Sequence, residues 1–244
     1  MPKSDETLFT SCIPSLADYT LIFLAFLGRI KLMRTFYRKL AGKGRMGIDV
    51  TLHVGMIYVA SGDLLNQEVE VIANSIGENV KAGFGGQIGR CIVKACGEDI
   101  ITEAYDQAVL NFKSGNVPIG KFVSTSAGNS EKHKFILHCV CPNFSDANSE
   151  AILTQLIQDV FQFCHDNNVE SISVPPMSSG VLGFPTKNCA KCFFEGIMNF
   201  LESVNMTTCM KKMYIVVYEE DKAKVSNCFP FPSSILYFSL QMLV

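Results

Sequence analysis

The sequence has little that would direct it to a membrane or to a nucleic acid. An apolar run at residues 19–27 is shorter than the roughly 20 residues that a membrane-spanning helix needs, and Asp18 bounds it. A secretory signal is poorly supported, because Lys3 is the only basic residue before this run. An interfacial membrane anchor at residues 19–40, or a helix packed on the domain, fits better. The formal net charge of −2 argues against a general nucleic-acid surface, so we expect no specific nucleic-acid partner.

Patterns for a metal site or a nucleophilic enzyme are also missing. Cys189-x-x-Cys192 has the spacing of half a zinc site, but no second pair completes it, and both residues lie in a helical pattern typical of core packing. His138 lies in an apolar run and is interpreted as a structural residue, whereas His133 is expected to be exposed. No Ser/His/Asp or Cys/His arrangement is present. We therefore expect no catalytic residue, no metal and no cofactor.

The cysteine content indicates the cellular compartment, and the length indicates the domain organisation. Ten scattered cysteines without a convincing secretory signal are typical of reduced thiols, so we expect a cytoplasmic and/or nuclear protein. The 244 residues, 48% of them hydrophobic, suffice for one substantial core. We divide the chain into an apolar and basic extension with its linker at 1–48, a main domain at 49–225 and an apolar tail at 226–244.

Strand and helix patterns alternate through the main domain. Strands are expected at 52–60, 69–74, 121–126, 134–140, 171–174 and 212–218, and helices at 87–96, 98–112, 149–167 and 186–204. Several strand patterns are near-continuous apolar runs, as expected for strands that are covered on both faces. The alternation predicts an α/β fold with three α/β/α layers and a mostly parallel mixed central sheet.

Two glycine-rich loops, each between a strand pattern and a helix pattern, carry the chemistry. They lie at residues 83–89 and 178–185. Backbone N–H groups in such loops bind anionic oxygens, helped by the positive end of the following helix. Neither loop has the Lys-Ser or Lys-Thr of a P-loop, and the first loop fails the G-x-G-x-x-G dinucleotide fingerprint. Either the glycines only make tight turns, or two loops at neighbouring strand ends close on one diphosphate.

The order of these motifs resembles the macrodomain family. Gly62-Asp63-Leu64-Leu65 is followed by the strand 69–75, the Gly85-Gly86 loop, and then Ala95-Cys96-Gly97. Further along, residues 123–128, 136–138 and 178–185 continue the order. The resemblance spans about Val50 to Val225 and is closest in style to the macrodomains of large poly-ADP-ribose polymerase relatives. It implies binding of ADP-ribose, free or attached to protein, and some members hydrolyse that linkage.

The resemblance also assigns expected roles to single positions. It gives Asp63 to the adenine amino group, which only donates hydrogen bonds, and the N–H of Leu64 to the adenine ring. Asn74 matches the first Asn of the family's Asn-Ala-Ala-Asn motif. The remaining positions are the distal-ribose and diphosphate contacts of the first loop (Gly85, Gly86, Ile88), the diphosphate amides of the second loop (Ser179, Gly180, Val181, Leu182, Gly183) and the aromatic that packs on the distal ribose (Phe184).

Two departures from the family pattern bear on activity. The second Asn of the motif falls on Gly77, and the Asp that several hydrolytic members carry in the first loop falls on Gly89. Hydrolysis needs a positioned water or a polarising group. We therefore favour a binding module for ADP-ribose or ADP-ribosylated protein. The alternatives are a hydrolase of ADP-ribosyl-protein and an interaction domain that has lost nucleotide binding.

Overall fold

The structure, a computed structural model, describes residues 56–205 and 208–217. The expected extension at 1–48, with its membrane contact at 19–40, and the tail at 226–244 lie outside the described residues. So does the start of the first expected strand. The proposed division of the chain at residues 48 and 225 therefore stays a prediction.

A six-stranded sheet forms the centre of the molecule, with the order β1-β6-β5-β2-β4-β3. All neighbouring strands are parallel except β3, which runs antiparallel to β4. The expected mostly parallel mixed sheet is thus confirmed. The strands are β1 (Met56–Ser61), β2 (Val71–Ile76), β3 (Phe122–Ser126), β4 (Phe135–Val140), β5 (Ser171–Val174) and β6 (Lys212–Val217).

The long helices lie where the sequence predicts them. They are α3 (Gln87–Cys96), α4 (Asp99–Phe112), α5 (Ser149–Asp166) and α6 (Thr186–Ser203). Two short elements were not predicted, the 3-10 helix η1 (Leu64–Asn66) and α2 (Val80–Gly83), because they are too short to show a period. A side chain caps the N-terminus of each: Asp63 accepts a hydrogen bond from the N–H of Leu65, and Asn79 accepts one from the N–H of Ala82.

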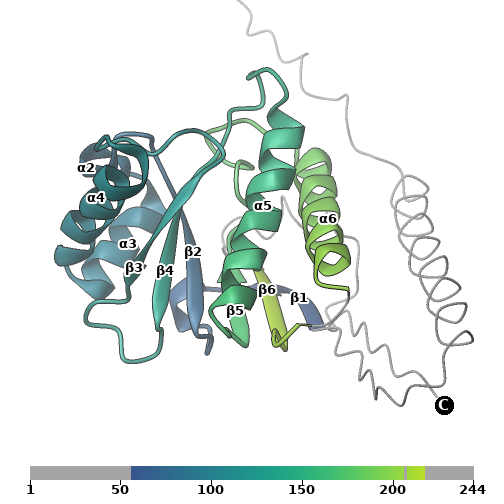
Figure 1. The fold of residues 1–244 in the computed structure, drawn as a ribbon, viewed down its shortest axis with the longest axis horizontal. Coiled ribbons are helices and arrows are strands. Elements are labelled where there is room, and N and C mark those ends of the chain that lie inside the picture. Colours follow the sequence, from purple (N-terminus) through teal and green to yellow (C-terminus); the bar gives the residue numbers. More distant parts are fainter. Residues whose placement is uncertain (1–55, 206–207, 218–244) are drawn as a thin grey trace, which may run out of the picture.

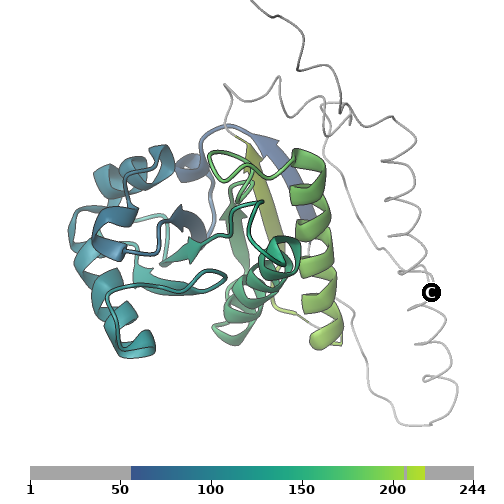
Figure 2. The ribbon, with the colours of Figure 1, turned by 90° about the horizontal axis from the view of Figure 1, so that it is seen from above.

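Helices cover both faces of the sheet, with α2, α3 and α4 on one side and α5 and α6 on the other (Figures 1 and 2). Alternation along β2 builds both cores, because successive side chains of a strand point to opposite faces. Val71 and Ala73 pack in the cluster that includes α5 and α6. Ile72 and Ile76 pack in the cluster that includes α3 and α4. The three-layer α/β/α fold is therefore as predicted.

The parallel arrangement sends four connecting segments out from one edge of the sheet. Residues 62–70 follow β1, 77–86 follow β2, 141–148 follow β4 and 175–185 follow β5. This carboxyl edge is the upper edge of the sheet in Figure 1 and faces the viewer in Figure 2. It is the edge at which open α/β sheets bind ligands.

The structure contradicts the prediction for His133 and confirms the one for Cys189 and Cys192. His133 is 7% exposed, so the expectation that it is exposed is wrong. Its Nδ1 lies 2.8 Å from the carbonyl oxygen of Val69, a bond that holds the segment before β2. Cys189 and Cys192 are buried in the core, as expected. Over 56–205 and 208–217, no cluster of metal-binding side chains is found, and no helix there has the length and apolarity to cross a membrane.

Candidate functional site

The loop after β5 presents backbone donors at the carboxyl edge. Internal hydrogen bonds hold it: the N–H of Gly183 donates to the carbonyl of Gly180 at 3.0 Å, and that of Phe184 donates to Ser178 at 3.0 Å. A further bond runs from the N–H of Ser179 to Pro176 at 3.2 Å. Among the described residues, the N–H groups of this loop without a partner are those of Met177, Ser178, Gly180, Val181 and Leu182, the last three of them consecutive. They are available to an anionic ligand.

Some glycines of the two loops have no packing reason to be glycine. A Cβ built on Gly86 or Gly180 meets no heavy atom within 4 Å. The φ of Gly86 is −65°, which any residue adopts. Gly89 differs, because a Cβ there would lie 2.7 Å from the carbonyl oxygen of Phe84. The glycine at 89 is thus required by close packing, whereas those at 86 and 180 border open space.

The loop after β2 folds back on itself before α3 begins. The N–H of Gly77 donates to the carbonyl of Gly83 at 3.3 Å, which closes the loop around α2. Gly85 and Gly86 are exposed beyond this closure, and Ile88 is half-buried against the α3 and α4 core. Arg90, one turn into α3, donates from Nη1 to the carbonyl oxygen of Gly85. The first loop is therefore closed at its base and anchored at its tip.

The segment after β1 carries the predicted adenine contacts. The exposed carboxylate of Asp63 accepts from the N–H of Leu65 at 2.9 Å and lies 3.3 Å from the side-chain amide of Asn66. A carboxylate accepts several hydrogen bonds, so capping leaves Asp63 able to accept another. Leu64 is buried, and its N–H has no partner among the described residues. Both groups remain available for the predicted contacts.

Asn74 lies beneath the first loop in a buried polar chain. Its side-chain amide lies 3.4 Å from Nδ1 of His138, whose Nε2 lies 2.9 Å from the hydroxyl of Thr125. That hydroxyl donates to the carbonyl of Ser126 at 2.8 Å, so it accepts from Nε2–H of His138. The His138 ring is therefore neutral and accepts from Asn74 at Nδ1. Burial lowers the pKa of His138 from 6.5 to about 3, which keeps it neutral at pH 7.

The hydrogen bonds among these buried side chains leave one acceptor of Asn74 without a partner. Asn74 is fully buried, and its Oδ1 has no hydrogen-bond partner among the described residues. A buried carbonyl in that state costs free energy unless a water or a ligand meets it. Asn74 thus lies below the loop rather than on its surface, and its expected contact with a ligand stays a prediction. The sequence could not show this, because the pairing of β2 with β4 places Asn74 beside His138, 64 positions along the chain. The ring of Phe84 packs edge-on against His138, with centroids 4.9 Å apart.

The aromatic side chains near the second loop divide into a buried ring and an exposed one. Phe184 is 3% exposed and packs edge-on against Phe144, with ring centroids 5.2 Å apart. Phe144 is 40% exposed, and its N–H donates to the carbonyl of Leu182 at 2.9 Å. The predicted contact of Phe184 with a ribose stays a prediction. The exposed Phe144 was missed, since a single Phe in a loop has no sequence signal.

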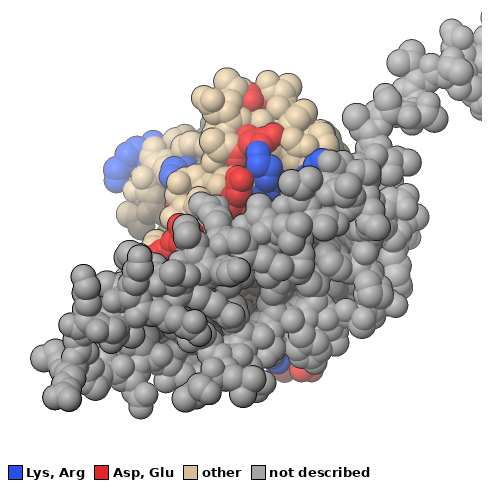
Figure 3. All heavy atoms as spheres, turned by 90° about the vertical axis from the view of Figure 1, so that its right-hand side faces the viewer, with Lys and Arg blue, Asp and Glu red and all other residues tan. Residues whose placement is uncertain are grey.

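The sheet order brings the two glycine-rich loops together and leaves Asp63 at a distance. The first loop follows β2 and the second follows β5, which are neighbours. Asp63 follows β1, which lies three strand spacings from β2, or about 14 Å. A ligand that contacts both loops and Asp63 must therefore be elongated. On the described surface in Figure 3, acidic and basic side chains are intermixed rather than gathered in one basic patch.

Comparisons with known proteins identify the same family as the motif order. The profile of the Macro domain family matches residues 72–193. A macro domain-containing protein of Listeria monocytogenes is 30% identical over 173 residues, which cover 70% of this chain and 94% of that protein. An ADP-ribose glycohydrolase of Archaeoglobus fulgidus is 28% identical over 186 residues, covering 73% of this chain and 91% of that protein.

A solved structure shows the same fold. The Oceanobacillus iheyensis macrodomain with ADP superimposes with a TM-score of 0.62 at 20% identity, covering 71% of this chain and 89% of that chain. The three-layer arrangement of sheet and helices described above is therefore the macrodomain fold.

Proposed function

The chain belongs to the macro domain family, and we propose that it binds ADP-ribose, either free or attached to a protein. Its role is that of a reader of ADP-ribosylation. The diphosphate lies between the first loop, at Gly85 and Gly86, and the free amides of the second loop. The adenine extends toward Asp63 and Leu64 at the end of β1. This places the elongated ligand along the carboxyl edge of the sheet.

The open glycines are the observation that carries this proposal. Gly86 and Gly180 lie on loops that follow neighbouring strands, and neither is needed for close packing in the described chain. Gly costs conformational entropy relative to Ala. A glycine without a structural reason is explained when a ligand approaches the backbone closely, as a diphosphate between two loops does. Free N–H groups next to Gly180 supply the donors for that ligand.

Isothermal titration of the full chain with ADP-ribose tests the proposal, with AMP as the control ligand. We expect saturable binding of ADP-ribose well above that of AMP. Gly86→Ala and Gly180→Ala are expected to weaken binding while leaving the melting temperature unchanged. The absence of heat from a chain shown to be folded would support an interaction domain that has lost nucleotide binding.

Hydrolysis of an ADP-ribosyl linkage is the second candidate, because the Archaeoglobus fulgidus relative is named a glycohydrolase. Across residues 77–89 and 175–185, Glu78 is the only carboxylate. The buried neutral His138 has no access to a substrate water. We therefore propose binding over catalysis. Release of ADP-ribose from a modified protein by the wild-type chain, lost in Glu78→Gln, would reverse that order.

The expectations about cellular location, family branch and nucleic-acid binding are part of the same proposal. We propose a cytoplasmic and/or nuclear location, which the reduced state of all eight described cysteines supports. We also retain the likeness to macrodomains of large poly-ADP-ribose polymerase relatives, and the expectation of no specific nucleic-acid partner. Fluorescence microscopy of the tagged chain and gel-shift assays with DNA and RNA test these expectations.

A further inference from the structure

Arg90 is unusual in this chain both by type and by place. The sequence has no other arginine after Arg45. It lies in the first turn of α3, directly after the glycine-rich loop, and its side chain is exposed. No carboxylate of the described residues pairs with it. Among the described residues, its side chain makes one hydrogen bond, from Nη1 to the carbonyl oxygen of Gly85.

That hydrogen bond fixes the direction of one peptide group. The described chain has no cis peptide bond, so the peptide between Gly85 and Gly86 is trans and planar. In a trans peptide the C=O and the N–H point in opposite directions. With the carbonyl of Gly85 turned toward Arg90, the N–H of Gly86 faces the opposite side of the loop. That N–H has no partner among the described residues.

We propose that Arg90 is a positioning residue for the anion site, acting through the Gly85–Gly86 peptide. It holds the Gly85 carbonyl away from the bound diphosphate and presents the N–H of Gly86 to it. The inference rests on the proposed function, because it deepens the account of the same site. Two adjacent glycines are the freest dipeptide of a chain, so without this anchor the peptide rotates and can turn its carbonyl oxygen toward the anion.

The same geometry argues against a direct ion pair between Arg90 and the ligand. The guanidinium lies on the carbonyl side of the peptide, whereas the free N–H points to the other side. An arginine that met the diphosphate directly would add a charge term that salt screens. A positioning arginine leaves the salt dependence of binding as it is. The two roles therefore predict different results in a salt series.

Titration of the full chain with ADP-ribose tests this role through a double-mutant cycle. We expect Arg90→Ala to weaken binding about tenfold, because the loop must then be ordered on binding. Arg90→Lys, which keeps one donor, is expected to restore part of the affinity. Gly86→Pro replaces the N–H by a ring carbon, and the φ of −65° at Gly86 suits proline. In that background Arg90→Ala should have no further effect.

Lys94→Ala is the matched control, because Lys94 is an exposed cation one turn further along α3. It should leave the affinity unchanged. An unchanged affinity in Arg90→Ala would overturn the inference while leaving the proposed function intact. The inference would also be overturned if Arg90→Ala lowered the affinity as much in the Gly86→Pro background as in the wild type. A weaker salt dependence of ADP-ribose binding in Arg90→Ala would overturn it as well. If the folded wild-type chain fails to bind ADP-ribose, the proposed function fails, and the inference fails with it.

Discussion

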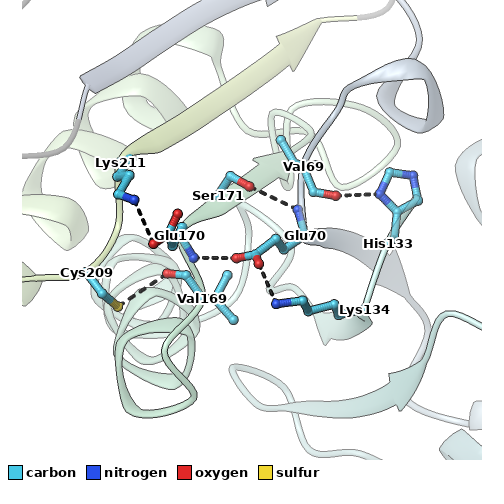
Figure 4. A network of polar contacts seen from close by, with 9 residues as sticks. All are labelled: Val69, Glu70, His133, Lys134, Val169, Glu170, Ser171, Cys209 and Lys211. Atoms are coloured by element: carbon cyan, nitrogen blue, oxygen red, sulfur yellow. Dashed lines mark hydrogen bonds and ion pairs between the residues drawn. The ribbon is translucent and has the colours of Figure 1, made fainter. Parts of the chain in front are cut away.

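The carboxyl and amino edges of the central sheet differ in whether their polar groups have hydrogen-bond partners. At the carboxyl edge, loop N–H groups are unpaired, glycines border open space and the buried Oδ1 of Asn74 lacks a partner. At the amino edge, polar groups are paired with one another across strands (Figure 4). The first edge has hydrogen-bonding groups available to the proposed ligand, whereas the second uses such groups to connect neighbouring strands.

Glu70 is the centre of the amino-edge network. Its carboxylate contacts Nζ of Lys134 at 2.5 Å and accepts from the N–H of Glu170 at 2.5 Å. Its own N–H donates to the hydroxyl of Ser171 at 3.0 Å. Burial raises the pKa of Glu70, but the hydrogen bonds from Lys134 and the N–H of Glu170 outweigh it and lower the pKa below its ordinary value. Lys211 completes the network by pairing with Glu170 at 2.7 Å.

The stabilising network and the proposed binding site therefore lie at opposite ends of the same strands. Glu70 precedes β2 and Gly85 follows it, so one strand connects the two regions. Changes at the carboxyl edge should alter affinity with little effect on folding. Changes at the amino edge should alter folding with little effect on affinity.

The largest effect is expected from a charge placed at the open glycine of the second loop. Gly180→Glu puts a carboxylate beside the free amides, where it repels the diphosphate. Affinity for ADP-ribose should fall a hundredfold or more, about 3 kcal/mol, with the melting temperature unchanged. Leu110→Glu, at a 63% exposed position on α4, is the matched control. Equal affinity of the Gly180→Glu chain and the control would place the diphosphate elsewhere.

Removal of the amino-edge carboxylate gives the converse result. Glu70→Ala leaves the N–H of Glu170 and the ammonium of Lys134 without their acceptor, which should cost about 1–2 kcal/mol of unfolding free energy because water reaches both groups. Urea unfolding measures this cost, and titration of the still-folded chain should show unchanged ADP-ribose affinity. Glu131→Ala removes an exposed carboxylate nearby and should change neither quantity. A loss of affinity in Glu70→Ala would contradict the separation of the two edges.

The buried histidine below the carboxyl edge predicts a pH dependence of stability. The folded chain holds the pKa of His138 at about 3, below its ordinary value of 6.5. The unfolded chain therefore binds an extra proton between these values, and stability falls as the pH drops through this window. The slope is about 1.4 kcal/mol per pH unit. His138→Gln cannot titrate, so urea unfolding at pH 6.5 and 5 should show a smaller decrease. Equal decreases in the two chains would refute the linkage.

The smallest effect is expected at the adenine end of the site. Asp63→Asn keeps an oxygen to cap η1, so the unfolding free energy should change by only a few tenths of a kcal/mol. It exchanges a charged acceptor for a neutral one, so ADP-ribose affinity should fall about tenfold. Asp99→Asn, in the first turn of α4, is the control. If the affinity survives, the adenine amino group does not contact Asp63.

The extent of sequence-based prediction differs between the elements. The helix at 87–96 and the strand at 171–174 begin and end at the predicted residues. A helical period that stops at Gly97 marks the helix, and a short β-branched pattern that stops at Pro175 marks the strand. The strand expected from residue 69 begins at Val71, since Val69 and Glu70 belong to the amino-edge contacts. The short elements η1 and α2 have no period to detect and depend on their capping side chains.

The sequence predicts which loops form the candidate site, but not the contacts that their residues make. Glycine-rich segments between strands and helices mark residues 83–89 and 178–185 in the sequence alone. Which glycines are open depends on what lies beside each Cβ position, and the sequence treats Gly86 and Gly89 alike. The contacts of Arg90 and Phe144 were missed for the same reason, because each residue donates to a loop carbonyl that only the fold places beside it.

The alternation of strands and helices, the family and the two glycine-rich loops follow from the sequence alone, because these are periodic or local patterns. The tertiary structure alone decided that Glu70 meets residues 64 and 100 positions away in the chain. It also decided that Asn74 and His138 are buried together, and that the free amides and open glycines gather at one edge. These features arise from strand order and register, which bring together segments that no local pattern connects.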